Sequence, residues 1–279
     1  MKNKIFTTLL ALAMLFGSQS VKAWGWFGHS GIAYVAEQHL TPEAKEKCQY
    51  YLRHTLAYYA SWMDYWRGME MFKSVNNPHS NKLTKDGMSL PVDKGGNPKG
   101  RVMGHLRNAL AELGDGKYKN LPDSVVRQRL INMVHYLPDM HCPSHVGGWE
   151  KTVFSHYAYV NVSNNGKPFP YHSFWDGAPM RDGRSKNWTI EDYGKNVDKV
   201  SRKQVKAWTS GTLADWGRDI ARGGHRGREL LPKDSDIAHL TPEQNKAIMA
   251  LADEMAMMAA YRLAFVLNTI FSDGNIPVK

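Results

Sequence analysis

The chain of 279 residues contains only two cysteines, Cys48 and Cys142. So few cysteines exclude a disulfide scaffold, although the sequence alone leaves a single bridge between the two open. Long apolar runs are also missing: the run at residues 5–16 is too short to span a bilayer, and no later stretch offers a span. No linker interrupts the sequence, so we expect residues 24–279 to form a single domain.

The N-terminus has the pattern of a secretory leader. Lys2 and Lys4 precede the apolar run, and small and polar residues then lead to Val21-Lys22-Ala23, which resembles a signal-peptidase site. We therefore predict a signal peptide at residues 1–23 and export to the periplasm or the medium. The formal charge of +10 falls to +7 after cleavage, because the leader holds three lysines and no acid. A basic mature chain weakly favours a polyanionic partner.

Histidine and aspartate recur at a spacing typical of metal sites. His135 and Asp139 are four residues apart, as are His172 and Asp176, and His145 lies between the pairs. Positions i and i+4 share one face of a helix, so each pair can converge on one ion. For one pair alone, a buried hydrogen bond would be the commoner explanation. Two pairs and a further histidine favour a metal site, with zinc as the best match to imidazole and carboxylate.

Cleavage after Ala23 would add ligands at the new N-terminus. The mature chain would begin Trp24-Gly-Trp-Phe-Gly-His29, so the α-amino group and carbonyl of Trp24 could chelate a metal together with His29. An aromatic N-terminus by itself would more often simply pack. Beside the other ligands, it indicates a metal site completed by processing. Cys142 also lies among the ligand candidates, but the histidines and aspartates already suffice without its thiol.

The secondary structure is predicted to be mostly helical. Caps and apolar stripes predict five helices. They lie at residues 41–54, 56–66, 101–113, 124–143 and from 241 onward. Ser124 is the expected cap of the fourth, and Pro138 should kink it. Between residues 153 and 170 we expect no more than a hairpin or irregular loop.

Several motifs resemble those of zinc-dependent single-strand nucleases of the S1/P1 type, whose mainly helical fold is shared with bacterial zinc phospholipase C. The N-terminal Trp-Gly-x-x-Gly-His motif matches residues 24–29, and Ala-Ser-Trp-x-Asp-x-x-Arg matches residues 60–67. His79 follows at the expected distance, and both His-x3-Asp boxes are present. The match is specific over residues 24–176, whereas residues 177–279 match only as a helical remainder. The expected fold is therefore mainly α, a single-domain, phospholipase-C-like bundle around a metal cleft.

The resemblance implies three zinc ions per chain. The ligands of the first would be Asp64, His79, His135 and Asp139. A close neighbour would be held by Trp24, His29 and the bridging Asp139. A third, more exposed ion would be held by His145, His172 and Asp176. Zinc lowers the pKa of bound water, so the family chemistry implies attack of a zinc-bound hydroxide on phosphorus. Asp64 would orient this nucleophile, and Arg67 would clamp the phosphate.

The sequence departs from the family pattern at three positions near these ligands. Pro138 replaces a usual glycine, Cys142 a glutamine, and Ser80 the base-stacking aromatic residue of fungal members. Five aromatic residues could replace that stacking, although each is more often core. They are Tyr65, Trp66, Tyr171, Phe174 and Trp175. Lys82 and Lys85 could contact the nucleic-acid backbone or only solvate a loop.

Three functions fit these observations to different degrees. The favoured one is an exported endonuclease that hydrolyses single-stranded DNA and RNA to 5′-phosphorylated products, with 3′-nucleotidase activity as an addition. The alternative is a zinc-dependent phospholipase C, but those enzymes resemble this pattern with glutamate in place of Asp176 and a shorter His145-to-His172 interval. A non-enzymatic zinc-binding protein ranks third, because open coordination positions and Arg67 argue against it. We expect a monomer with no obligate protein partner.

Overall fold

The computed structural model describes residues 24–66, 80–99, 101–147, 159–161, 174–177, 187–231 and 237–279. The described part is mainly helical, which confirms the predicted fold class. Its helices in the N-terminal half are α2 (Gly25–Gln38), α3 (Pro42–Leu52), α4 (Leu56–Tyr59), α5 (Trp62–Trp66), α6 (Arg101–Leu113) and α7 (Asp123–His141). The later helices are α10 (Ile190–Val197), α11 (Arg202–Thr209), α12 (Leu213–Glu229) and α13 (Pro242–Phe271). Short 3-10 turns lie at Lys117–Asn120 and Pro143–His145.

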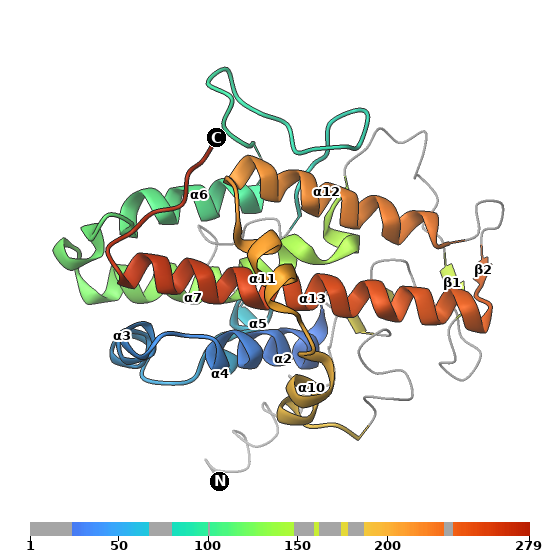
Figure 1. Ribbon diagram of the computed structural model, residues 1–279, viewed down its shortest axis with the longest axis horizontal. Helices are drawn as coiled ribbons and strands as arrows, with labels where there is room; N and C mark the ends of the chain where they lie inside the picture. The colour runs from blue at the N-terminus through green and yellow to red at the C-terminus, as the bar shows by residue number, and fades with distance from the viewer. Residues whose placement is uncertain are drawn as a thin grey trace, which may run out of the picture.

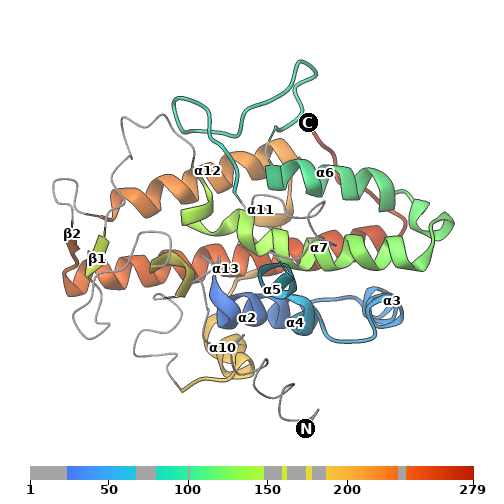
Figure 2. The same ribbon diagram turned by 180° about the vertical axis from the view of Figure 1, so that it is seen from behind.

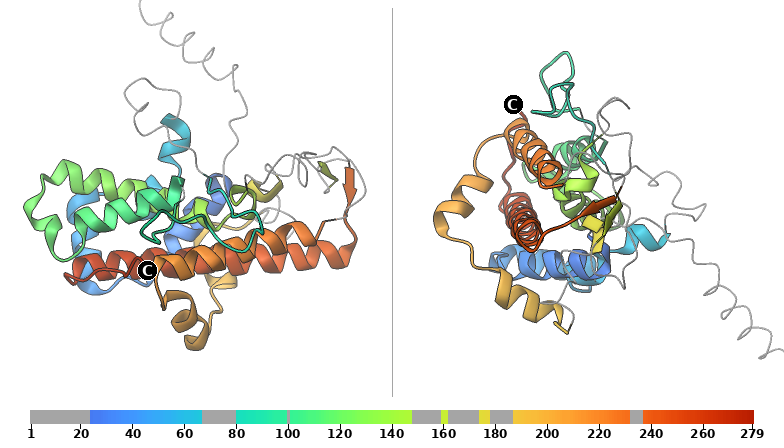
Figure 3. Two further views of the ribbon diagram at one scale, coloured as in Figure 1. Left: turned by 90° about the horizontal axis from the view of Figure 1, so that it is seen from above. Right: turned by 90° about the vertical axis from the view of Figure 1, so that its right-hand side faces the viewer.

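Four long helices, α6, α7, α12 and α13, run along the long axis of the molecule (Figures 1 and 2). Figure 3 shows them end-on in its right panel. Helix α13 packs against both α2 and α7, so it lies at the centre of the assembly. The buried apolar side chains form one continuous core, to which all four long helices contribute. In the described part of the chain no helix is long and apolar enough to cross a bilayer.

The helix starts follow the capping chemistry that the sequence predicts. The Thr41 hydroxyl accepts a hydrogen bond from the Ala44 N–H at the start of α3, and Thr41 precedes a proline at the first helical position. At the start of α13, Thr241 forms a reciprocal capping box with Gln244. Helix α6 spans the predicted residues 101–113. These three predictions are confirmed.

Three local predictions were wrong. The helix expected over residues 56–66 is two short helices, and at the break between them the Ala60 carbonyl accepts a hydrogen bond from His135 Nδ1. Helix α7 begins at Asp123, so Ser124 lies inside its first turn and is not its cap. The strand β1 (Tyr159–Asn161) pairs in parallel with β2 (Ile237–His239), a contact between distant segments and not a hairpin.

The sequence left a bridge between the two cysteines open. Cys48 and Cys142 are both buried free thiols, so they form no bridge.

Candidate metal centre

Helix α7 places His135 and Asp139 one turn apart on the same face. Both side chains are completely buried, and His135 Nε2 lies 3.3 Å from Asp139 Oδ2. Pro138 stands between them inside the helix. Its carbonyl accepts a hydrogen bond of 2.8 Å from the indole Nε1 of Trp24, which is also fully buried. This contact joins the start of α2 to the turn of α7 that carries Asp139.

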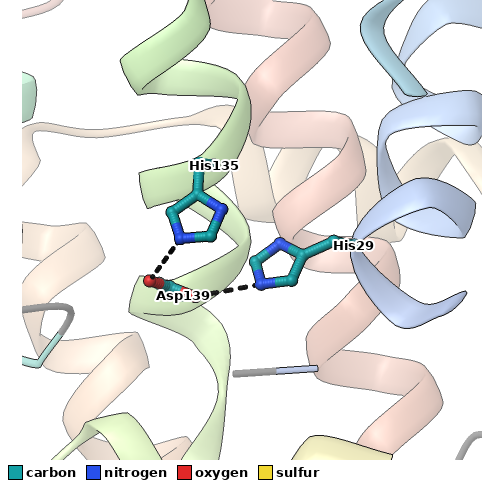
Figure 4. Close-up of side chains that lie close together, drawn as sticks. All are labelled: His29, His135 and Asp139. Carbon is teal, nitrogen blue, oxygen red and sulfur yellow. Dashed lines mark ion pairs between the residues drawn. The ribbon is translucent and has the colours of Figure 1, made fainter. Parts of the chain in front are cut away.

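Helix α2 brings His29 to the same point. His29 Nε2 lies 3.2 Å from Asp139 Oδ1, and the His29 and His135 rings stack with centroids 4.4 Å apart (Figure 4). The ligand atoms of His29, His135 and Asp139 all lie within 4.8 Å of one another. Two helices distant in sequence thus supply three ligand-type side chains to one buried point.

Three further predicted ligands extend this group. Asp64 on α5 is buried, and its Oδ1 lies 3.9 Å from His135 Nε2. His145 follows α7, with Nδ1 at 4.0 Å from Asp139 Oδ2 and Nε2 at 4.0 Å from Asp176 Oδ1. Asp176 is buried within the helical residues 174–177 and also accepts a hydrogen bond of 3.4 Å from Ser144 Oγ. A continuous series of His/Asp contacts therefore links Asp64 at one end to Asp176 at the other.

The orientation of His135 is fixed by the backbone. Its Nδ1 donates a hydrogen bond of 2.7 Å to the Ala60 carbonyl, which leaves Nε2 facing Asp139 and Asp64. Metal-bound histidines usually have such a second partner, which sets the tautomer and the ring orientation. No sequence motif predicts this contact, because a backbone carbonyl has no signature in side-chain motifs, although Ala60 is part of the matched segment at residues 60–67.

Burial and the neighbouring carboxylates shift the pKa values of the two stacked histidines in opposite directions. Burial lowers the pKa of His29, and the neighbouring His135 lowers it further, so His29 is neutral near pH 7. Burial also disfavours the charged form of His135, but Asp139 and then Asp64 outweigh it and raise the pKa of His135 to about 9. Without a metal, a proton on His135 compensates part of the negative charge in this buried group.

The donor set fits a metal ion. Imidazole nitrogens and carboxylate oxygens are ligands for zinc, and they converge here without solvent access. Neither ring nitrogen of the fully buried His29 makes a well-oriented hydrogen bond to a described residue. Buried polar atoms rarely stay in that state unless an ion or water completes them, so the arrangement is suited to a cation held between His29, His135 and Asp139.

Three predicted site residues, Arg67, His79 and His172, lie outside the described residues. Among the candidates for base stacking, Phe174 and Trp175 are buried and belong to the core, whereas Tyr65 is 59% exposed beside Asp64. Tyr171 and the side chain of Trp66 also lie outside the described part. Lys82 and Lys85 are both exposed.

Comparison with known families agrees with this geometry. The model of the S1/P1 nuclease family matches residues 24–272. The chain belongs to the S1/P1 nuclease family. This membership confirms the resemblance drawn from the motifs, and it extends over the C-terminal helices that the motifs did not cover. S1/P1 nucleases are metal-dependent phosphodiesterases that act on nucleic acid, so this S1/P1 protein is a hydrolytic nuclease. No curated protein matches the chain.

Proposed function

We propose that this S1/P1 nuclease is an exported, zinc-dependent endonuclease that cleaves single-stranded DNA and RNA and leaves 5′-phosphorylated products. The observation that carries the proposal is the buried group of His29, His135 and Asp139, in a chain that belongs to a nuclease family. The predicted mature protein, residues 24–279, would hold three zinc ions and act as a monomer. 3′-Nucleotidase activity on mononucleotides is part of the proposal.

Each carboxylate in the group has a separate role in this proposal. Asp139 would bridge two ions, because its two oxygens face different imidazoles. Asp64, at the other side of His135, would hold the first ion and orient the attacking water. His145 and Asp176 would share the third ion with His172. When bound, zinc would supply Lewis acidity that activates water and neutralises charge on the phosphate. Arg67 would fix the phosphate through its planar guanidinium.

Two observations support cleavage before Trp24. The family match begins at residue 24. In addition, Trp24 has a φ of 50°, in the left-handed region that bulky residues rarely occupy. A chain that starts at Trp24 has no preceding peptide and therefore no such restriction. Cleavage would relieve the strain and at the same time free the α-amino group proposed as a metal ligand.

The test is hydrolysis by the purified mature protein with zinc, offered single-stranded DNA, RNA, duplex DNA and a phosphatidylcholine analogue in parallel. We expect the two single-stranded polymers to be cut fastest, with 5′-phosphate ends, and native mass spectrometry to show close to three zinc ions. Chelation should abolish activity, and zinc should restore it best among divalent ions. Turnover of phosphatidylcholine without nucleic-acid cleavage would contradict the proposal in favour of the phospholipase.

An Asp139→Ala variant tests whether zinc binding and activity depend on this group of side chains. It should lose both zinc and activity, and its melting temperature should no longer rise on zinc addition, because zinc stabilises only a fold that binds it. The matched control is Asp215→Ala, which removes a partly buried helix-cap carboxylate on α12 and should retain the zinc. Full zinc occupancy in Asp139→Ala would remove the bridging role from the proposal.

A further inference from the structure

Helices α6 and α7 enclose a pocket on a different side of α7 from the metal ligands. Its volume is about 240 Å³, and its walls come only from these two helices, which lie side by side in Figure 2. Tyr136 lines the pocket and directly follows His135. Consecutive residues of a helix are rotated by about 100° about its axis, so the pocket face and the metal face of α7 are different faces.

The floor of the pocket is apolar and closely packed. Leu106 and Ala109 of α6 and Met133 and Leu137 of α7 line it, and each is at least nine-tenths buried. Against this floor the His105 ring stacks on Tyr136, with ring centroids 5.2 Å apart and planes inclined by 29°. A floor of this kind, beside an aromatic stack, favours a flat ligand.

Three of the polar side chains that line the pocket are uncharged and available. Asn108, Asn132 and His105 line it, and none of these side chains makes a hydrogen bond to another described residue. Burial lowers the pKa of His105, and Arg129 lowers it further, so the imidazole is neutral and offers one donor and one acceptor. Two carboxamides and a neutral imidazole thus present both donors and acceptors beside the apolar floor of the pocket.

The two charged side chains that line the pocket neutralise each other. Arg129 Nε and a terminal nitrogen bind the two oxygens of Glu112 at 2.6 and 3.2 Å. Because this guanidinium is occupied by a carboxylate, the pocket has no cation left to attract a phosphate. The volume is also below the range of about 300–1,000 Å³ usual for drug-sized ligands, which limits the occupant to one small ring system.

We propose that the α6–α7 pocket binds a single nucleobase, separately from the metal centre. A nucleobase is flat and neutral, and its edges carry the donors and acceptors that carboxamides and imidazole pair with. The choice of a nucleobase among flat heterocycles rests on the proposed function, whose substrates and products carry one. The pocket would hold a base of a bound strand, or of a product, at a second point on the enzyme.

The test measures adenosine binding to the metal-free mature protein in chelator, by calorimetry, together with ring-resonance shifts of His105 and Tyr136. We expect binding at a single pocket site, with shifts confined to those rings. Asn132→Leu removes a carboxamide at nearly constant volume and should weaken binding at least about tenfold, since the ligand edge loses its hydrogen bonds. Ala109→Leu fills the pocket and should have the same effect. The control is Gln128→Leu, an exposed amide on α7 outside the pocket, which should change the affinity less than about twofold.

Three outcomes would overturn the proposal. They are a lack of adenosine binding, binding that neither pocket variant weakens, and competition by ribose 5-phosphate, which carries no base. Turnover plays no part in this measurement. A protein that binds adenosine here but cleaves no nucleic acid would therefore refute the proposed nuclease activity and leave the pocket assignment standing.

Discussion

At the scale of single residues, Asp139 offers its oxygens to three imidazoles. Oδ1 faces His29, while Oδ2 lies 3.3 Å from His135 Nε2 and 4.0 Å from His145 Nδ1. The three histidines come from α2, α7 and the turn after α7. Three segments pack around this one buried carboxylate. Asparagine at position 139 would keep the shape of the side chain but remove the negative charge that the three imidazoles face.

The proposed zinc binding should depend on pH through His135. Its pKa is raised to about 9 in the metal-free protein, mainly by Asp139 against the opposing effect of burial, while zinc requires the neutral ring. The His135 proton must therefore leave when zinc binds at pH 7.5, and affinity should fall by up to about tenfold per pH unit below 9. Calorimetry in buffers of different ionisation enthalpy measures this proton release.

The same titration at pH 10 is the internal control, because His135 is then already neutral and its contribution should vanish. The stability of the metal-free protein should depend on pH in the opposite sense to its zinc affinity. A folded-state pKa above the unfolded value of about 6.5 gives stability that is present at lower pH and is lost as pH rises through 9. Zinc binding at pH 7.5 without proton release would contradict the raised pKa.

At the scale of elements, Gly224 sets how closely α12 approaches the turn that carries His145. A Cβ at this position would lie 2.8 Å from Val146 Cβ, closer than side-chain atoms normally approach. Val146 is completely buried and directly follows His145. Gly224→Ala should therefore displace this turn and destabilise the protein by about 1–3 kcal/mol. Chemical denaturation measures the stability, and zinc stoichiometry reports the displacement.

Gly104→Ala is the matched control within a helix. Nothing lies within 4 Å of a Cβ built at Gly104 on α6. Alanine there should stabilise the protein by about 0.5–1 kcal/mol, because glycine is the poorer helix former. Equal effects of the two substitutions on stability would show that helix propensity, and not the close approach to Val146, determines the effect of Gly224→Ala.

The sequence predicted those elements that local signals define. Thr41 and Thr241 cap the helices that follow them, and the apolar stripe of residues 101–113 is a complete helix. Capping boxes at Thr189, Ser201 and Thr212 also start α10, α11 and α12, so their starts were readable although the sequence analysis placed no bounds there. The Ala60 carbonyl at the break accepts a hydrogen bond from His135, and β1 pairs with β2. Both are contacts between distant segments, which no local pattern encodes.

The candidate site divides in the same way. Spacing alone placed His135 and Asp139 on one face, and the N-terminal residues already made His29 a candidate ligand. That His29 shares Asp139 with His135 was implied only by the family resemblance, because α2 and α7 are far apart in sequence. Arg262 had no signal at all. Its buried guanidinium binds the Trp208 carbonyl at 2.8 Å, Asp219 at 2.6 Å and His141 Nε2 at 3.0 Å, and so anchors the end of α7 to α11 and α12. A lone arginine in an apolar stripe gives no indication of such partners.

At the scale of the whole molecule, the positive charge of the chain predicts salt-dependent catalysis. The chain carries +10 in full, and +7 without the three lysines of the predicted leader. Binding of a single strand that neutralises about three phosphates should weaken about twentyfold when the salt concentration rises fourfold, because counterion release then contributes less. The measurement is kcat/KM on an oligonucleotide at several salt concentrations.

A small phosphodiester with a single charge is the control substrate, since it releases few counterions and its kcat/KM should change little. If kcat/KM fell equally with salt for the small and the polymeric substrate, the salt effect would come from the candidate metal site, and the predicted role of surface charge would be wrong. Single strands should also be cut faster than duplex at every salt concentration, because a buried metal group is easier to reach for a flexible backbone.

The burial of Trp24 also bears on how a cell survives making such an enzyme. The indole is enclosed against the last turns of α7, and its backbone stands at the point where the leader is proposed to end. Under the proposed processing, a precursor that keeps its leader would have a peptide nitrogen where the mature enzyme has an amine, so one of the proposed ions would lack a ligand. The nuclease would become competent only after it has left the compartment that holds the genome and the messenger RNA. Export and activation would then be a single event, and no separate inhibitor would be required for self-protection.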